Sequence, residues 1–135
     1  EELVIHKVDL SGIILKPNMI LAGNKSKEKI SSDEVSEKTL KCLKSSVPSE
    51  VPGIAFLSGG QSEIEATENL NLINKNNDTK FIFTYSYGRA LQQEALKLWS
   101  ENTNNIEGTQ KIFNHRAKMC SLAAQGIWAS KLENK

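Results

Sequence analysis

The chain contains three short runs of consecutive apolar residues, and each run is followed by a polar turn and a segment with helical periodicity. The runs occupy residues 12–15, 53–57 and 81–85. Runs that are apolar throughout, without alternation, are typical of strands buried on both faces of a parallel sheet. The pattern therefore predicts three buried parallel strands that alternate with helices.

Capping sequences mark the starts of the first two expected helices. Ser31 and Ser62 are each followed three residues later by a glutamate, which is the S-x-x-E pattern of a capping box. The first helix is expected to end near Ser46, before Pro48, and the second before the polar turn at residues 76–78. The residues expected on their inward faces are Val35, Thr39, Cys42 and Leu43 in the first helix and Ile64, Thr67, Leu70 and Ile73 in the second.

Two further helices are expected at residues 90–99 and 107–131, with a polar linker between them. Alternating strands and helices predict right-handed parallel crossovers, so the fold class is α/β. Three strands cannot close a barrel, which needs about eight βα units, and an open sheet of three strands would expose apolar edges. The chain is therefore expected to be part of a larger barrel or sheet. It begins with Glu1 rather than methionine, which agrees with a start inside a longer gene product.

Composition and charge exclude several classes of function. With 39% hydrophobic and 24% charged residues, the chain is neither disordered nor membrane-embedded. Its 17 Lys+Arg and 16 Asp+Glu give a net charge of +1, so no long-range field indicates a nucleic-acid partner. No apolar stretch approaches the roughly 20 residues of a membrane span, and the acidic start is not a signal peptide. Cys42 and Cys120 lack metal-ligand spacing, which favours a reduced, cytoplasmic protein.

The first expected strand ends on Lys16, with Pro17 behind it. Proline cannot donate to a sheet ladder and biases the preceding residue toward extended backbone, so it would hold Lys16 at the end of the strand. Surrounded by Ile13, Ile14 and Leu15, the ammonium would lose solvation, its pKa would fall, and the free amine could form an imine with a carbonyl. The alternative is a lysine that extends from the strand end into water.

The other two strand ends suit an anion. Ser58 and Gly59 begin a glycine-containing turn before a helix, where backbone N–H groups and the helix dipole favour phosphate. The alternative is a tight turn in which Ser62 is the N-cap. Gly88 and Arg89 close the third strand in a similar way and add a guanidinium, which could equally pair with a helix carboxylate. A carbonyl compound carried on a phosphate ester would satisfy all three strand ends.

Three sequence motifs at these strand ends resemble a known family. They read ILKPNM, GIAFLSGGQSE and SYGRALQ, and the helix segment ATENLNLINK is also similar. In this order and spacing they resemble the class I fructose-bisphosphate aldolases. The resemblance implies a (β/α)8 TIM barrel in which residues 1–135 are the C-terminal portion of one domain, namely the last three βα units and the C-terminal helix. It also implies reversible cleavage of fructose 1,6-bisphosphate to dihydroxyacetone phosphate and glyceraldehyde 3-phosphate, in glycolysis and gluconeogenesis.

The resemblance assigns a role to each strand end. Lys16 would form the imine with the substrate ketone, and the protonated imine would act as the electron sink. This lyase would therefore need neither a metal nor a cofactor. The residues that match the family's site for the phosphate beside the ketone carbon are Ser58, Gly59, Gly88 and Arg89, with Ser86 next to them.

The chain also departs from the family pattern. The family's acid and base groups lie on earlier strands, none of which precedes Glu1, so this chain by itself is not expected to be a complete catalyst. Residues 20–23 read ILAG in place of the valine-threonine-proline-glycine turn of animal enzymes. No tyrosine follows Tyr87, whereas the eukaryotic family ends in a tyrosine that assists proton transfer.

Two alternative functions stay open from the sequence. One is another lysine-imine aldolase, acting on a different sugar phosphate. The other is a binding protein on an aldolase barrel that has lost catalysis. The resemblance further implies a homotetramer, and partners of the kind that aldolases bind, namely actin or adhesin tails.

Overall fold

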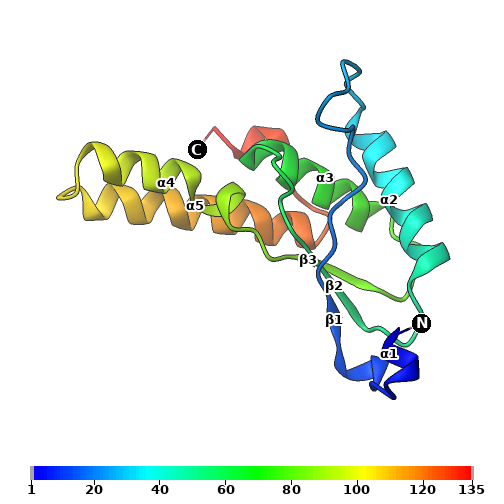
Figure 1. Cartoon of the computed structure of the whole chain (residues 1–135). Helices are drawn as coiled ribbons and strands as arrows, with labels where there is room; N and C mark the ends of the chain where they lie inside the picture. Colours follow the sequence, from blue (N-terminus) through cyan, green and yellow to red (C-terminus); the bar gives the residue numbers. More distant parts are fainter. Residues whose placement is uncertain (1, 135) are drawn as a thin grey trace.

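The computed structural model describes residues 2–134, which form one parallel sheet with helices packed against it (Figure 1). The elements in chain order are α1 (Glu2–Ile5), a 3-10 turn (Leu10–Gly12), β1 (Ile14–Leu15), α2 (Ser32–Ser46), β2 (Gly53–Phe56), α3 (Glu63–Lys75), β3 (Ile82–Tyr85), α4 (Arg89–Glu101), α5 (Ile106–Ala124) and a second 3-10 turn (Ser130–Leu132). Strands thus alternate with helices, which confirms the predicted α/β class.

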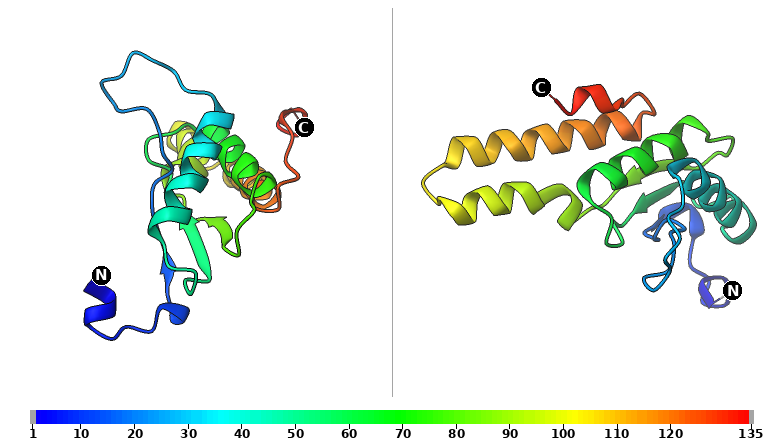
Figure 2. Two further views of the ribbon diagram at one scale, coloured as in Figure 1. Left: turned by 90° about the vertical axis from the view of Figure 1, so that its right-hand side faces the viewer. Right: turned by 90° about the horizontal axis from the view of Figure 1, so that it is seen from above.

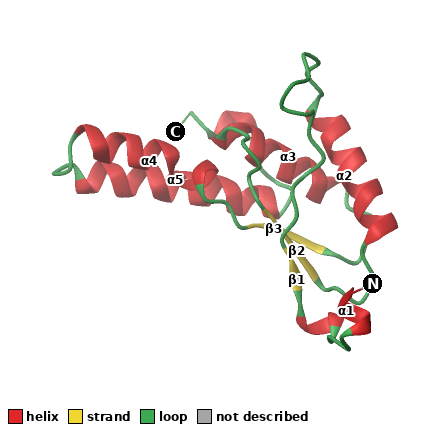
Figure 3. Cartoon of the chain, in the orientation of Figure 1, coloured by secondary structure: helices red, strands yellow, loops and turns green. Residues whose placement is uncertain are grey.

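The three strands lie in sequence order, β1-β2-β3, and both pairs are parallel. Ile14 pairs with Gly53, and Gly53 pairs with Ile82, so one row of residues crosses the whole sheet. Figure 3 shows the strands side by side with much longer helices around them. Parallel pairing in this order places all three carboxyl ends at the same edge of the sheet.

Helices cover one face of the sheet, whereas the other face is open within the described residues. Ile54, Phe56 and Phe83 point into the covered face and are at most 1% exposed. Ile14 and Ile82 point the opposite way and are 70% and 71% exposed. The prediction that the strands are buried on both faces is therefore wrong for this part of the structure, because side chains alternate along a strand and only one helical layer is present.

The core lies between the covered face and helix α3. On one side α3 contacts α2 and on the other side it contacts α5. Leu70 and Ile73 of α3 are fully buried, and the rings of Phe56 and Phe83 stack with centroids 5.7 Å apart. The helices α4 and α5 lie side by side and extend beyond the sheet (Figure 2). None of the helices within residues 2–134 combines the length and the apolarity needed to cross a lipid bilayer.

The helix starts follow the capping sequences. Ser62 accepts a hydrogen bond from the Glu65 N–H at 3.2 Å, and the Glu65 carboxylate accepts one from the Ser62 N–H at 2.9 Å, which completes a capping box. Ser31 makes only the first of these bonds, to the Glu34 N–H. The Glu34 side chain pairs instead with Lys38. Only the second of the two predicted capping boxes is therefore complete.

Three details of the predicted helices are wrong. The final helix ends at Ala124 rather than near residue 131, because Gly126 adopts a φ of +70° that terminates it. Cys42 is exposed, since the buried arc of α2 is rotated toward Ser36 and Leu40. Ile64, from the first turn of α3, is 41% exposed, because that helix buries the side centred on Ala66 and Leu70.

A buried arginine ties the segment after α5 to the rest of the core. Arg116 is 6% exposed and donates hydrogen bonds to both carboxylate oxygens of Glu133, at 3.0 and 2.8 Å. Trp128 donates a third bond to Glu133 at 2.8 Å, and Arg116 Nε lies 3.5 Å from Glu63 at the start of α3. Burial by itself raises the pKa of Glu133, but the hydrogen bonds from Arg116, Trp128 and His115, together with the positive charge of Arg116, lower it by more.

We expect Glu133→Gln to lower the free energy of unfolding at pH 7 by about 3 kcal/mol, because it leaves Arg116 buried with one carboxylate fewer. A carboxyl with a depressed folded-state pKa stabilises the fold above its unfolded pKa of 4.5, and this stabilisation is lost as the pH falls through the lower, folded-state value. The free energy of unfolding, measured with urea at pH values across that range, should therefore fall more steeply with decreasing pH for the natural chain than for the variant. An equal dependence of the unfolding free energy on pH in the two proteins would contradict a stabilising role of the Glu133 carboxylate. As a control, Lys38→Ala at the exposed pair should change stability by less than about 0.5 kcal/mol.

Candidate active site

The carboxyl ends of the three strands bring the predicted site residues to one edge of the sheet. Lys16 and Ser86 are the first residues beyond β1 and β3. Two backbone hydrogen bonds continue the pairing past the strands, from Leu57 N–H to Pro17 at 3.0 Å and from Ser86 N–H to the carbonyl of Phe56 at 2.8 Å. The turns that follow the strands are therefore neighbours in the order β1, β2, β3.

Lys16 lies on the open face of the sheet. It is two residues from Ile14, so the two side chains leave the strand on the same side, and both are exposed. The apolar neighbours that were expected to desolvate Lys16 do not enclose it, because the Leu15 side chain points toward the core. The expected loss of solvation is thus not produced by the described residues.

The turn after β2 has the backbone conformation that its glycines predict. Gly59 and Gly60 have φ values of +57° and +84°, a left-handed region that side chains disfavour. A Cβ at Gly59 would lie 2.1 Å from Oδ1 of Asn18, whereas a Cβ at Gly60 would meet nothing within 4 Å. Ser58 is 9% exposed. Helix α3 then begins from its Ser62 cap, so the turn carries Gly59 at the surface directly before a helix N-terminus.

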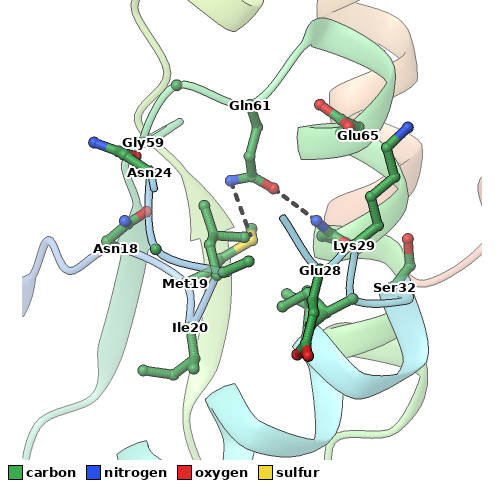
Figure 4. A pocket seen from close by; sticks show the side chains of 17 residues that line it. Asn18, Met19, Ile20, Asn24, Glu28, Lys29, Ser32, Gly59, Gln61 and Glu65 are labelled. Atoms are coloured by element: carbon green, nitrogen blue, oxygen red, sulfur yellow. Dashed lines mark hydrogen bonds between the residues drawn. The ribbon is translucent and has the colours of Figure 1, made fainter. Parts of the chain in front are cut away.

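Sequence reasoning missed two side chains that hold this turn. The amide Nε2 of Gln61 donates to the Ser58 carbonyl at 2.9 Å and lies 3.7 Å from the sulfur of Met19, as Figure 4 shows for the second contact. Asn69 of α3 donates to Oε1 of Gln61 at 2.7 Å. A polar residue at an inward position of α3 was the available signal for Asn69.

The third turn presents a free helix N-terminus and a guanidinium. Gly88 is the N-cap of α4, with no side-chain capping bond, and Arg89 is the first helical residue. Both are exposed. Within residues 2–134 Arg89 makes no ion pair, so the alternative of a helix carboxylate partner is not found in this part of the chain. Uncapped N–H groups beside an arginine suit an anion.

A hollow beside the second turn is not this site. It is bounded by the stretch from Asn18 to Gly23, by Gly59 and Gln61, and by Lys29 (Figure 4). Of the predicted site residues, Gly59 lines it, whereas Lys16, Ser58, Ser86, Gly88 and Arg89 do not. Over the described range no three His, Cys, Asp or Glu side chains gather into a group that could hold a metal ion. Apart from Gly59, the predicted residues therefore share the sheet edge and not this hollow.

A family model described as fructose-bisphosphate aldolase class-I matches residues 1–135. The chain belongs to the class-I fructose-bisphosphate aldolase family. This confirms the family predicted from the motifs at the three strand ends, and it agrees with a βα arrangement in which those ends meet.

Curated members of the aldolase family are similar over most of the chain. A probable fructose-bisphosphate aldolase class 1 from Xylella fastidiosa is 47% identical over 124 residues, which is 91% of this chain and 37% of that protein. Fructose-bisphosphate aldolase 4, cytosolic, from Arabidopsis thaliana is 47% identical over 122 residues, which is 90% of this chain and 31% of that protein. The chain thus spans about a third of the length of these aldolases.

A solved aldolase structure has the same fold as this chain. It is the fructose-bisphosphate aldolase from Plasmodium falciparum in complex with TRAP and a small-molecule inhibitor. The two superpose with a TM-score of 0.86 at 41% sequence identity, over 91% of this chain and 35% of that chain. The arrangement of strands and helices described above is therefore that of part of an aldolase.

We expect Gly59→Ala to destabilise the chain more than Gly60→Ala does. Gly60→Ala introduces only a left-handed alanine, which costs about 1 kcal/mol, whereas Gly59→Ala adds a clash with Asn18. The double variant Gly59→Ala with Asn18→Ala should recover the steric part, so that only the backbone strain is left. Thermal unfolding of the four proteins measures this, and equal losses for the two single variants would contradict the role of Asn18.

Proposed function

We propose that the protein is a class I, lysine-imine aldolase that reversibly cleaves fructose 1,6-bisphosphate to dihydroxyacetone phosphate and glyceraldehyde 3-phosphate. One observation carries the proposal. In a chain that belongs to the aldolase family, the parallel sheet has Lys16 at the same edge as two glycine-containing turns, the nearer of which follows β2, and the N–H groups of both turns suit a phosphate. A lysine amine and a phosphate site in adjacent turns suit a substrate that carries its ketone next to a phosphate ester.

In the proposed reaction the free amine of Lys16 attacks the substrate ketone, and loss of water gives a protonated imine. Removal of the proton from the C4 hydroxyl lets the C3–C4 bond break and releases the aldehyde. The electron pair of that bond moves toward the cationic nitrogen and gives an enamine. Protonation of the enamine carbon and hydrolysis then release dihydroxyacetone phosphate and the amine. The family resemblance places the groups that transfer these protons on earlier strands.

We propose that residues 1–135 form the last three βα units and the C-terminal helix of a TIM-barrel domain. The open face of the sheet supports this, because Ile14 and Ile82 would otherwise leave an apolar row in water. Strands that covered this face would also surround Lys16. They would supply the apolar, low-dielectric surroundings that favour a neutral amine over an ammonium.

The phosphate beside the ketone carbon would bind between the second and third turns. In this proposal the N–H groups of Ser58 and Gly59 meet it from one side, and the N-terminus of α4 with Gly88 and Arg89 meets it from the other. Ser86, at the end of β3, lies next to the same position. Arg89 suits this role because it is exposed and has no carboxylate partner among the described residues.

We further propose that the protein acts in the cytosol, in glycolysis and gluconeogenesis, and assembles as a homotetramer. The cytosolic name of the Arabidopsis relative supports the location, and the family resemblance supports the assembly. The complex of the Plasmodium relative with TRAP supports a protein partner in addition to the substrate. The family resemblance favours a partner of the actin or adhesin-tail kind.

Borohydride reduction in the presence of dihydroxyacetone phosphate should add a covalent adduct to Lys16 of the complete natural protein, because reduction traps the imine. Intact mass and peptide mapping locate the adduct. Lys16→Arg should abolish it, whereas Lys25→Arg, at an exposed lysine of the neighbouring loop, should retain it. An adduct on a different lysine would contradict the role of Lys16, and no adduct in a folded protein would favour a non-catalytic binding function.

Aldol cleavage should persist unchanged after dialysis against a metal chelator, since the protonated imine does the work that a metal Lewis acid does in other aldolases. The measurement is the rate of fructose 1,6-bisphosphate cleavage before and after chelation, with a zinc-dependent aldolase treated in parallel. Activity that is lost on chelation and restored by zinc would contradict the lysine-imine mechanism.

A further inference from the structure

The side chain of Gln61 closes the turn that follows β2. Its Nε2 donates to the Ser58 carbonyl at 2.9 Å, and the Gln61 backbone N–H donates to the same oxygen at 3.0 Å. On its other side, Oε1 accepts from Asn69 at 2.7 Å. Asn69 is only 5% exposed and lies on α3, which forms the centre of the core. A glycine-rich surface turn is thus connected to a rigid helix through one glutamine.

The direction of these hydrogen bonds is fixed by chemistry. A backbone carbonyl can only accept, so the amide end of Gln61 that faces Ser58 must be its NH2 group. Its oxygen then faces Asn69, which must present its own NH2 group. As a result Asn69 Oδ1 is buried and has no hydrogen-bond partner among the described residues. Burying an unsatisfied acceptor is unfavourable, so packing alone does not explain this pair of amides.

The effect of Gln61 on the turn follows from the planarity of the peptide group. The Ser58 carbonyl and the Gly59 N–H belong to one trans peptide, so they point in opposite directions. Two bonds hold the carbonyl toward Gln61, which directs the Gly59 N–H away from Gln61. Within residues 2–134 this N–H donates to no acceptor, and Gly59 is exposed.

We propose that Gln61 is a positioning residue that orients the peptide between Ser58 and Gly59, so that the Gly59 N–H faces the phosphate of the substrate. Asn69 acts through Gln61 by fixing the direction of its amide. The inference rests on the proposed function, because it requires a phosphate-bearing ketone that reacts with Lys16. Gln61 itself touches no reacting atom. Its loss should therefore weaken the recognition of phosphate without impairing the chemistry of the lysine.

The test compares two ketones that differ only in the phosphate. Lys16 of the complete natural protein is trapped with borohydride over a range of dihydroxyacetone phosphate concentrations, and then over a range of dihydroxyacetone concentrations. In Gln61→Met the concentration of the phosphate ester needed for half-maximal trapping should rise about tenfold, which corresponds to one lost hydrogen bond. Trapping by dihydroxyacetone should not change. Gln61→Glu should show the same difference, because a carboxylate oxygen would face the Ser58 carbonyl.

A matched control comes from the same helix. Asn71 is also buried, but its side chain accepts from the backbone N–H of Trp128, which belongs to the segment after α5 and not to the turn. Asn71→Leu should lower the unfolding temperature without changing the ratio of the two half-maximal trapping concentrations, that of dihydroxyacetone phosphate and that of dihydroxyacetone. Asn69→Leu should change that ratio. The double variant Gln61→Met with Asn69→Leu replaces both amides by apolar groups, so it should fold stably and show the same tenfold effect as Gln61→Met.

The outcomes distinguish a failure of the positioning role of Gln61 from a failure of the proposed aldolase function. Unchanged trapping by the phosphate ester in folded Gln61→Met, or an equal loss with both ketones, would overturn the positioning role and leave the aldolase proposal standing. If the natural protein itself forms no adduct on Lys16 with either ketone, the proposed function fails, and the inference about Gln61 fails with it.

Discussion

The parallel register of β1, β2 and β3 is the constraint on which the other features depend. Because the strands run in the same direction and in sequence order, three turns that are far apart in the chain meet at one edge. The short β1 has only two paired residues, yet the bond from Leu57 N–H to Pro17 extends the pairing to the residue after Lys16. Moving one strand by a single residue would exchange its two faces and place Lys16 against the helices.

The turns at that edge are held in a defined conformation by the helices that follow them. Each turn leads into a helix start. The start of α3 is fixed by its capping box and by Arg116 beside Glu63, and the turn before it is held by Asn69 through Gln61. A glycine turn with left-handed residues has little intrinsic rigidity. Its precision therefore depends on contacts with a helix that is itself held in the core, which is how sites on rigid elements achieve defined geometry.

Sequence patterns predicted the parts of the structure that depend on local chemistry. The capping serines, the strand positions and the glycine turn follow from residue preferences that act over a few positions, and the structure confirms them. The patterns failed where packing against a neighbouring helix or strand determines which side of an element is buried. Cys42 and Ile64 fit a helical stripe, but the direction in which each helix faces is set by packing against its neighbours. Gln61 and Asn69 were missed because their contact joins a turn to a distant point on a helix.

The reactivity proposed for Lys16 depends on its surroundings and not on the residue alone. The same backbone that places Lys16 at the strand end also places it on the face with Ile14 and Ile82, which is open to solvent here. The sequence around Lys16 sets its position, whereas the burial that would make its amine a nucleophile depends on what covers this face. The apolar row and the lysine lie on one uncovered face, and both require that this face be buried. Whatever covers the isoleucines also desolvates the amine, so burial of this face would stabilise the fold and activate the proposed nucleophile together.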